Sequence, residues 1–311
     1  MSGSERHKFL YNKLNMSYPK ISIVTPSFNQ VKYLEKTILS ILDQNYPNLE
    51  YLIIDGGSTD GSVDIIKKYK DKLTYWVSEP DNGLYHALQK GFDKTTGEIM
   101  GWLNSDDMLH RNSLFTLAEI FALKDVRWVQ GIPSHYDEYC RCITISPFRK
   151  WSKFNFWQGE YQWIQQESTY WHRDLWKKSG GYISQDYKYA GDMELWNRFF
   201  KCEKLYSLEA LIGGYRVRSS NQLALEFSAD YLEEADNILK KNVFDDLTKK
   251  ILSKVSKIKQ KTTSKNKLRR ILNKTLFSIK YHYLTNQLEK MCDYPPMIIF
   301  DRKEQKFCIK T

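Results

Sequence analysis

The chain is organised around the stretch GWLNSDDML, residues 101–109. A short apolar run over residues 98–103 ends there in two adjacent carboxylates, a pattern typical of a buried strand that emerges at the edge of a sheet. Asp106 and Asp107 repel each other, and a hard divalent cation such as Mg2+ or Mn2+ would offset that repulsion through oxygen ligands. The same residues also suit a turn and a helix N-cap, so the rest of the sequence must decide between the two interpretations.

Composition limits the class of protein. The 311 residues are 41% hydrophobic, which is enough for one large domain, or for one domain with an appendage. No apolar stretch has the length of a membrane span, and the polar residues 1–20 lack the apolar segment of a secretion signal. The five cysteines lack metal-site or redox spacing, so we expect reduced thiols in a cytoplasmic protein. The net charge of +10 is concentrated after Lys240.

Strands and helices alternate in the first hundred residues. Each β-branched or apolar run is followed by a turn signal and then by a segment of helical periodicity. This alternation predicts βαβ crossovers and a mostly parallel sheet flanked by helices. The predicted strands are residues 21–25, 51–54, 73–77 and 98–103, and the helices between them are 33–42, 63–69 and 84–93.

The ends of the four strands carry polar and acidic residues. Right-handed crossovers bring the carboxyl ends of parallel strands to one edge of the sheet, where ligands bind. The four ends are residues 25–29, 55–60, 79–81 and 104–107. So many carboxylates at one edge would repel each other strongly without a cation. We therefore interpret this edge as a metal and nucleotide site rather than as a set of unrelated caps.

The pattern is looser beyond residue 107. We divide the chain into three parts: a lead-in (1–18), a main domain (19–222) and a basic, helical C-terminal region (223–311). The main domain is crowded with aromatic residues between 148 and 176. Further predicted elements are a helix at 114–123, a strand at 127–130, a hairpin at 136–146, a helix from 189 to 201, strands at 205–208, 212–217 and 297–300, and lysine-rich helices from 227 to 280.

Several short motifs together resemble a known family. They are SIVTPSFN (22–29), IDGGSTDGS (54–62), DNG (81–83) with KG (90–91), LNSDD (103–107) and GDMEL (191–195). In this order and spacing they resemble the family 2 glycosyltransferases of the bacterial surface-polysaccharide type, across residues 19–222. The resemblance implies the GT-A fold, with a Rossmann-like, mostly parallel α/β sheet flanked by helices. It also implies an inverting hexosyltransferase that uses a nucleotide-sugar donor.

The resemblance assigns the nucleotide site residue by residue. Asp55 would accept a hydrogen bond from the base, because a uracil or thymine ring offers an N–H group to a carboxylate. Thr25, Pro26 and Asn29 would line the base and ribose pocket. Asp81 stands where relatives contact the nucleotide. UDP is the first choice of nucleotide over dTDP or GDP.

The metal motif adds the diphosphate contacts. Asp106 and Asp107 would hold Mn2+ or Mg2+, with Asp107 as the direct ligand, and Asn104 stands where relatives often have aspartate. Lys90 could add a positive charge, or could lie on a solvated helix face. Arg218 replaces a histidine of the relatives. Because a guanidinium pairs with phosphate but does not ligate metals, we expect Arg218 to clamp the diphosphate.

The catalytic base and the acceptor side complete the assignment. Asp192 matches the family's base, although it would also suit a helix N-cap, and Glu194 is the reserve candidate. Gln166 and Glu167 lie in a stretch that borders the acceptor in relatives. Trp163 could stack on a sugar face, although most tryptophans of this segment belong to a core. The acceptor would be a saccharide or a lipid-linked saccharide in cell-surface polysaccharide synthesis, such as that of lipopolysaccharide or capsule.

The lysine-rich segment 240–280 has apolar residues at near-helical spacing. Such helices either lie on an anionic membrane, at the inner face of the plasma membrane, or pack as an appendage with a solvated lysine face. Two rival functions remain: a nucleotide-sugar-binding module without catalysis, and a nucleic-acid-binding protein. The acidic edge of the sheet argues against nucleic acid, because it would repel a phosphate backbone.

Overall fold

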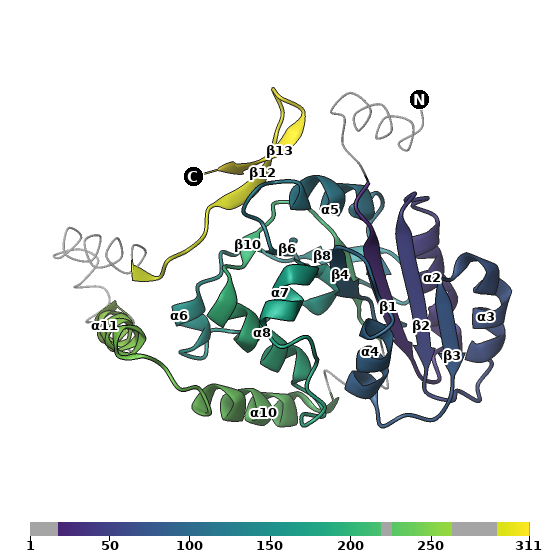
Figure 1. Cartoon of the computed structure of the whole chain (residues 1–311), viewed down its shortest axis with the longest axis horizontal. Helices are drawn as coiled ribbons and strands as arrows, with labels where there is room; N and C mark the ends of the chain where they lie inside the picture. Colours follow the sequence, from purple (N-terminus) through teal and green to yellow (C-terminus); the bar gives the residue numbers. More distant parts are fainter. Residues whose placement is uncertain (1–17, 219–225, 263–290, 311) are drawn as a thin grey trace.

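The computed structural model describes residues 18–218, 226–262 and 291–310 of the chain (Figure 1). The described strands are β1 (Ile21–Ser27), β2 (Leu49–Asp55), β3 (Tyr75–Ser78), β4 (Ile99–Trp102), β5 (Met108–Leu109), β6 (Trp128–Gln130), β7 (Ser134–Tyr136), β8 (Cys142–Ile145), β9 (Thr169–His172), β10 (Tyr206–Ser207), β11 (Gly213–Arg216), β12 (Met297–Asp301) and β13 (Lys306–Lys310). The described helices are α2 (Val31–Leu42), α3 (Ser62–Tyr69), α4 (Leu84–Phe92), α5 (Ser113–Phe121), α6 (Lys153–Phe156), α7 (Arg173–Lys178), α8 (Gly191–Cys202), α10 (Ser228–Lys240) and α11 (Asp246–Thr262), with 3-10 turns at Lys70–Lys72 (η1) and Gln166–Ser168 (η2).

The predicted parallel sheet is confirmed. Seven strands follow the order β10-β6-β9-β4-β1-β2-β3, and β1 pairs in parallel with both β2 and β4. All seven residues of β1 are buried, because helices cover both faces of the sheet. The register places Ser27 beside Asp55, and Asp55 beside Ser78. The carboxyl ends of the first three strands therefore meet at one edge, as the crossovers predict.

Strand β9 was not predicted. It lies between β4 and β6 and runs antiparallel to both, so that Trp171 pairs with Met100 and with Trp128. Its four residues, Thr169–His172, do not alternate between apolar and polar because both faces of the strand are largely buried, so the pattern that marks a half-buried strand is missing. Trp171 packs edge-on against Trp102, which stacks on Trp196 at 5.7 Å between ring centroids. The aromatic segment thus serves mainly as core.

A second sheet joins the segment that follows Asp107 to residues 213–216. Its order is β5-β11-β7-β8, and the predicted hairpin is present as β7 and β8. Strand β5 follows directly after Asp107 and pairs with β11, with Leu109 beside Gly213. This pairing carries residues 216–218 to the acidic edge of the main sheet. The sequence predicted the strand at 212–217 but no strand at Met108–Leu109, and it gave no indication that the two segments are neighbours.

The C-terminal region packs on the main domain. Ala235 and Ile238 of α10 are buried in the same hydrophobic core as Trp196. Helix α11 packs on α6 through the buried Val255, and the terminal segment forms the hairpin β12–β13 rather than a single strand. The predicted helices over 263–280 lie outside the described residues. Within the described part of the chain, no helix combines the length and the apolar character that a membrane span requires.

Candidate active site

Asp107 lies at the centre of a buried polar cluster. The loop that follows β4 is fixed from α2, where the Thr37 hydroxyl donates to the carbonyl oxygens of Ser105 (2.9 Å) and Asp107 (2.7 Å). The Asp107 side chain is fully buried, and its Oδ1 accepts the backbone N–H of Arg216 at 2.9 Å. Asn104 and Gln166 approach Oδ2 with their amide nitrogens at 3.3 and 3.4 Å. The predicted metal motif and the predicted acceptor stretch therefore share one cluster.

The cluster contains oxygen atoms that suit a cation. Asn104 Oδ1, Gln166 Oε1 and Glu167 Oε1 are buried, and none of them has a hydrogen-bond partner among the described residues. An unpaired buried acceptor costs free energy unless a cation or water satisfies it. Carboxylate and amide oxygens are the ligands that Mg2+ and Mn2+ prefer. The residues present therefore fit a hard divalent ion, although the described residues contain no group of three histidine, cysteine or acidic side chains suited to a metal.

The acidic groups disfavour one another in the absence of a cation. Burial raises the pKa of Asp107 well above its usual range, and the nearby carboxyl groups of Asp106 and Glu167 raise it further. Burial likewise raises the pKa of Glu167 to about 8. A bound divalent ion would favour the charged forms and reverse these shifts. Such perturbed carboxyl groups are typical of functional sites.

Two arginines from the end of β11 enclose the carboxylates. The Arg218 guanidinium forms an ion pair with Asp106 at 3.0 Å and donates to Gln30 Oε1 at 3.2 Å. Arg216 was not predicted as a site residue, yet its side chain is fully buried and donates to the carbonyl oxygen of Asp106. Both guanidinium groups lie 5.4 Å from the ring centroid of Tyr33. Arg218 thus reaches the predicted metal site, and its contact with a diphosphate stays a prediction.

The loops of the predicted nucleotide pocket are tied together. The backbone N–H of Asn29 donates to the Ser58 hydroxyl at 2.8 Å, and Thr59 N–H donates to Asn29 Oδ1 at 3.0 Å. Asp55 is fully buried and accepts from Ser58, through its N–H (2.8 Å) and hydroxyl (2.6 Å), and from the Ser78 hydroxyl (2.7 Å). Its carboxylate therefore organises the loop that follows β2. The predicted contact of Asp55 with a base stays a prediction.

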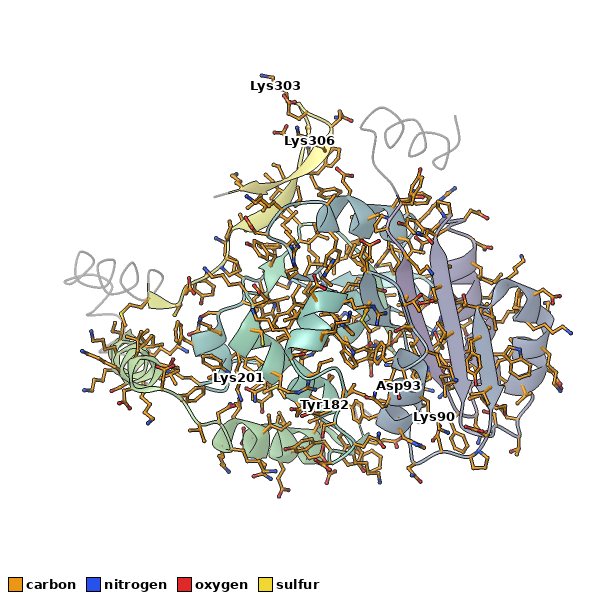
Figure 2. All side chains as sticks on the ribbon, viewed as in Figure 1. Lys90, Asp93, Tyr182, Lys201, Lys303 and Lys306 are labelled. Carbon is orange, nitrogen blue, oxygen red and sulfur yellow. The ribbon has the colours of Figure 1, made fainter. Side chains whose placement is uncertain are left out.

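The other predicted nucleotide residues surround this loop. Asp81 packs directly on Gly56, because a Cβ atom at that glycine would lie 2.9 Å from Asp81 Oδ2. Thr25 and Pro26 are buried, and the Thr25 hydroxyl lies 3.1 Å from the Tyr51 hydroxyl; their contact with base and ribose stays a prediction. Lys90 forms an ion pair with Glu79 at 2.8 Å (its position is labelled in Figure 2). The predicted phosphate contact of Lys90 stays a prediction.

Asp192 is the second residue of helix α8 and is partly buried. Its Oδ1 accepts the N–H of Met193 at 2.7 Å, and the side chains of Tyr85 and Tyr231 also hydrogen-bond its carboxylate. Burial raises the pKa of Asp192 to about 6, although these hydrogen bonds counteract the rise. Asp192 is not a side-chain N-cap, since the cap position is Ala190 and lacks a side-chain hydrogen bond. A carboxylate with this pKa is suited to act as a general base near neutral pH.

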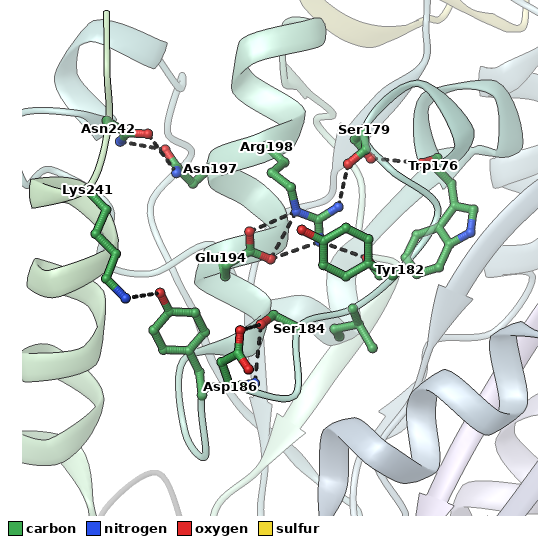
Figure 3. Close-up of polar contacts among 12 residues, drawn as sticks. Trp176, Ser179, Tyr182, Ser184, Asp186, Glu194, Asn197, Arg198, Lys241 and Asn242 are labelled. Carbon is green, nitrogen blue, oxygen red and sulfur yellow. Dashed lines mark hydrogen bonds and ion pairs between the residues drawn. The ribbon is translucent and has the colours of Figure 1, made fainter.

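Glu194, the reserve candidate for the base, has a structural role. Arg198 donates to both of its carboxylate oxygens, from Nε at 2.8 and 3.0 Å and from Nη2 at 2.9 Å (Figure 3). The same guanidinium donates to the carbonyl oxygens of Ser179 and Tyr182. Both charged side chains are largely buried. If Glu194 accepted a proton, it would become neutral and Arg198 would lose its charged partner. This pair joins α8 to the preceding loop.

Glu167 connects the two halves of the site. Its carboxyl group interacts electrostatically with both Asp106 and Asp192. Trp163 is 49% exposed, unlike the core tryptophans, and its ring contacts Tyr231 at 5.4 Å between centroids. The predicted acceptor residues therefore lie close to the predicted base. The sequence suggested this through motif order alone, since no local pattern connects residues 163–167 with Asp192.

The fold is that of a GT-A glycosyltransferase. Residues 22–177, about half of the chain, match the family described as Glycosyl transferase family 2. The chain belongs to this family, which confirms the resemblance drawn from the motifs.

Individual proteins show the same likeness. An uncharacterized glycosyltransferase of Rickettsia typhi is 27% identical over 201 residues, which cover 62% of this chain and 63% of that protein. The chain thus spans less than two thirds of that relative. Among solved structures, TarS of S. aureus in complex with UDP-GlcNAc has a TM-score of 0.61 at 15% identity, covering 88% of this chain and 81% of TarS. A mannosyltransferase of Pyrobaculum calidifontis in complex with GDP-Man and Mn2+ has a TM-score of 0.58 at 15% identity, covering 93% and 91%. At these identities the structures show the shared fold.

Proposed function

We propose that this protein transfers a sugar from a nucleoside-diphosphate donor to an acceptor hydroxyl, with inversion at the anomeric carbon. The observation that carries the proposal is the turn at Gln166–Ser168: Gln166 approaches Asp107 at 3.4 Å, and the charges of Asp106 and Asp192 both raise the pKa of the adjacent, buried Glu167. This turn supports a single site shared by the acidic pair after β4 and the acid at the start of α8. A donor whose diphosphate lies at the acidic pair would present its sugar toward Asp192.

In this proposal Asp192 accepts the proton of the acceptor hydroxyl while the acceptor oxygen forms its bond to the anomeric carbon. The bond between that carbon and the diphosphate oxygen breaks, and the nucleoside diphosphate leaves with the electron pair. The pKa of about 6 supports this role. An ordinary aspartate at 3.8 is a weaker base, whereas Asp192 is stronger and still largely ionised at neutral pH. Positioning supplies the rest of the effect.

Asp107 and Asp106 would hold a divalent ion, Mn2+ or Mg2+, and the amide oxygens of Asn104 and Gln166 could complete its shell. When bound, the ion supplies positive charge that stabilises the leaving diphosphate. Arg218 would exchange its ion pair with Asp106 for the diphosphate, where its planar guanidinium can bind two oxygens. A UDP-sugar is the favoured donor, and the similarity to TarS in complex with UDP-GlcNAc supports this choice.

The acceptor is proposed to be a saccharide or lipid-linked saccharide in cell-surface polysaccharide synthesis. The half-exposed ring of Trp163 beside Tyr231 offers a flat apolar face for a pyranose. Helix α11 supports a peripheral position at the inner face of the plasma membrane. Its apolar side packs on α6, while Lys249, Lys250 and Lys254 are exposed. Replacing these three lysines with glutamate should abolish sedimentation with phosphatidylglycerol vesicles, and unchanged sedimentation would reject the membrane contact.

A nucleotide-binding assay separates the parts of the proposal. Wild-type protein should be stabilised by UDP-GlcNAc or GDP-mannose together with Mn2+, by about 2.7 kcal/mol at a hundredfold excess over the dissociation constant. Asp107→Asn should lose this response, whereas the exposed Asp71→Asn should keep it. Asp192→Asn should keep the response but release no nucleoside diphosphate from the donor. An unchanged response in Asp107→Asn would reject the metal site, and full turnover in Asp192→Asn would reject the base.

The ion pair between Asp106 and Arg218 also favours a second candidate function, a binding module without catalysis. In that case Asp106 would stay paired with Arg218 when the nucleotide sugar binds. Wild-type protein that is stabilised by the donor but never cleaves it, with any acceptor saccharide tested, would support the module over the enzyme.

A further inference from the structure

The loop that leads into Asp192 is held from helix α10, which follows the main domain in sequence. Glu234 accepts three consecutive backbone N–H groups, those of Lys188 (3.0 Å), Tyr189 (2.9 Å) and Ala190 (2.8 Å). Hydrogen bonds to a charged acceptor are about twice as strong as neutral ones. Because α8 begins directly after Ala190, the carboxylate of Glu234 sets the position from which Asp192 projects.

Tyr231 lies one turn before Glu234, on the same face of α10. Its side chain hydrogen-bonds the Asp192 carboxylate. Tyr85 of α4 approaches the same carboxylate at 3.5 Å, and its hydroxyl donates to the Tyr189 carbonyl at 2.7 Å. Within the described part of the chain, titratable groups that act on Asp192 are Tyr85, Tyr231 and the more distant Glu167.

The far end of α10 is fastened to α8 as well. Asn242 and Asn197 exchange amide hydrogen bonds at 3.0 and 2.9 Å, and Lys241 donates to the Tyr187 hydroxyl at 3.2 Å (Figure 3). At the near end, the ring of Phe227 stacks on Tyr189 at 4.9 Å. The helix therefore spans the loop and the first turns of α8, and it is attached on both sides of Asp192.

Anchoring of the helix does not require the polar groups that face Asp192. Ala235 and Ile238 are fully or almost fully buried and attach α10 to the core. A hydroxyl and a carboxylate directed at the loop add little to that packing and must be desolvated. The placement of the Tyr231 hydroxyl and the Glu234 carboxylate is explained if they hold Asp192 in position.

We propose that α10 is the positioning element of the base, in which Tyr231 fixes the Asp192 carboxylate and Glu234 fixes the backbone that carries it. This inference rests on the proposed role of Asp192. Tyr231 also contacts Trp163, so the residue that orients the base touches the predicted acceptor side. Tyr231 and Glu234 are positioning residues, since neither receives the proton.

The test measures the ionisation of Asp192 directly. Protein labelled with 13C at the aspartate carboxyl carbons is titrated by NMR, and the signal missing from Asp192→Asn identifies Asp192. Loss of a hydrogen bond to the charged carboxylate should raise its pKa by about one unit in Tyr231→Phe. Tyr187→Phe, which loses a hydroxyl bonded to Lys241, should leave the pKa of Asp192 unchanged. An unchanged pKa in Tyr231→Phe would overturn the role of Tyr231.

Turnover of the donor supplies the second measurement. Glu234→Gln should lower kcat about tenfold with little change in KM for the donor, whereas the neighbouring, exposed Glu233→Gln should match wild type. Wild-type kcat in a folded Glu234→Gln protein would reject the role of Glu234. If Asp192→Asn itself keeps full turnover, the proposed base fails. If only Asp192→Asn is inactive while the α10 variants behave as wild type, the positioning role alone fails.

Discussion

Replacing Asp192 with asparagine should stabilise the folded protein while it removes the proposed base. In the folded state the pKa of Asp192 is about 6, against an ordinary value of 3.8. Between these values the folded state binds a proton that the unfolded state has released, so stability falls as pH rises from about 4 to about 6. Above pH 6 the full cost is present. A shift of about two units corresponds to about 3 kcal/mol, which is an upper limit for the gain.

Asparagine mimics the neutral carboxyl group and cannot ionise, so it avoids this cost. The gain should be about 1–3 kcal/mol at pH 7.5, because the amide keeps an acceptor for the Met193 N–H. It should disappear below pH 4, where both states of the wild type are protonated. For a chain of this size such a gain raises Tm by roughly 2–8 °C.

The measurement is thermal unfolding of both proteins from pH 4 to pH 8, without divalent cations. Glu194→Gln is the matched control, since it neutralises a carboxylate two residues away on the same helix. It should lower stability, because Arg198 would lose its partner in a largely buried pair. An Asp192→Asn protein less stable than wild type at pH 7.5, or equally affected at pH 4 and pH 8, would refute the burial argument.

Three further outcomes follow from the site. Turnover of the donor should fall on the acid side with a midpoint near pH 6, where Asp192 becomes protonated, and a midpoint near pH 4 would contradict this. Removal of divalent ions with EDTA should abolish turnover, and added Mn2+ should restore it; full activity in EDTA would exclude a metal at Asp107. Gly191→Ala should reduce kcat several-fold, since a Cβ atom there would lie 2.8 Å from the Tyr85 ring beside Asp192. Gly159→Ala strains a backbone of φ +90° but places its Cβ atom near no other group, so it should lower stability more than kcat.

The sequence was sufficient for the parallel half of the fold because its local patterns agree with its long-range order. Each strand from β1 to β4 is an apolar run followed by a turn signal, and crossover handedness then brings Asp55, Asp81 and Asp107 to one edge. The buried strand β9 lacked alternation and could not be recognised locally. Pairing of β5 with β11 is a tertiary event, which explains why Arg216 was missed.

The structural roles of Glu194 and Asp55 could have been predicted from the spacing of residues along the sequence. Glu194 and Arg198 stand four residues apart on one helix, the spacing at which opposite charges pair. Asp55 precedes a Gly-Gly-Ser turn, where an aspartate commonly accepts hydrogen bonds from residues that follow. The contact of α10 with Asp192 had no such signal, because the two segments are about forty residues apart and meet only in the folded chain.

The ion pair between Asp106 and Arg218 couples the binding of the cation to the binding of the nucleotide. A cation that binds Asp106 alone leaves Arg218 without its counter-charge. A diphosphate that binds Arg218 alone leaves Asp106 without its own. Only when both arrive is every charge matched again. Manganese and nucleotide should therefore strengthen each other's binding, and reciprocity requires the two enhancements to be equal.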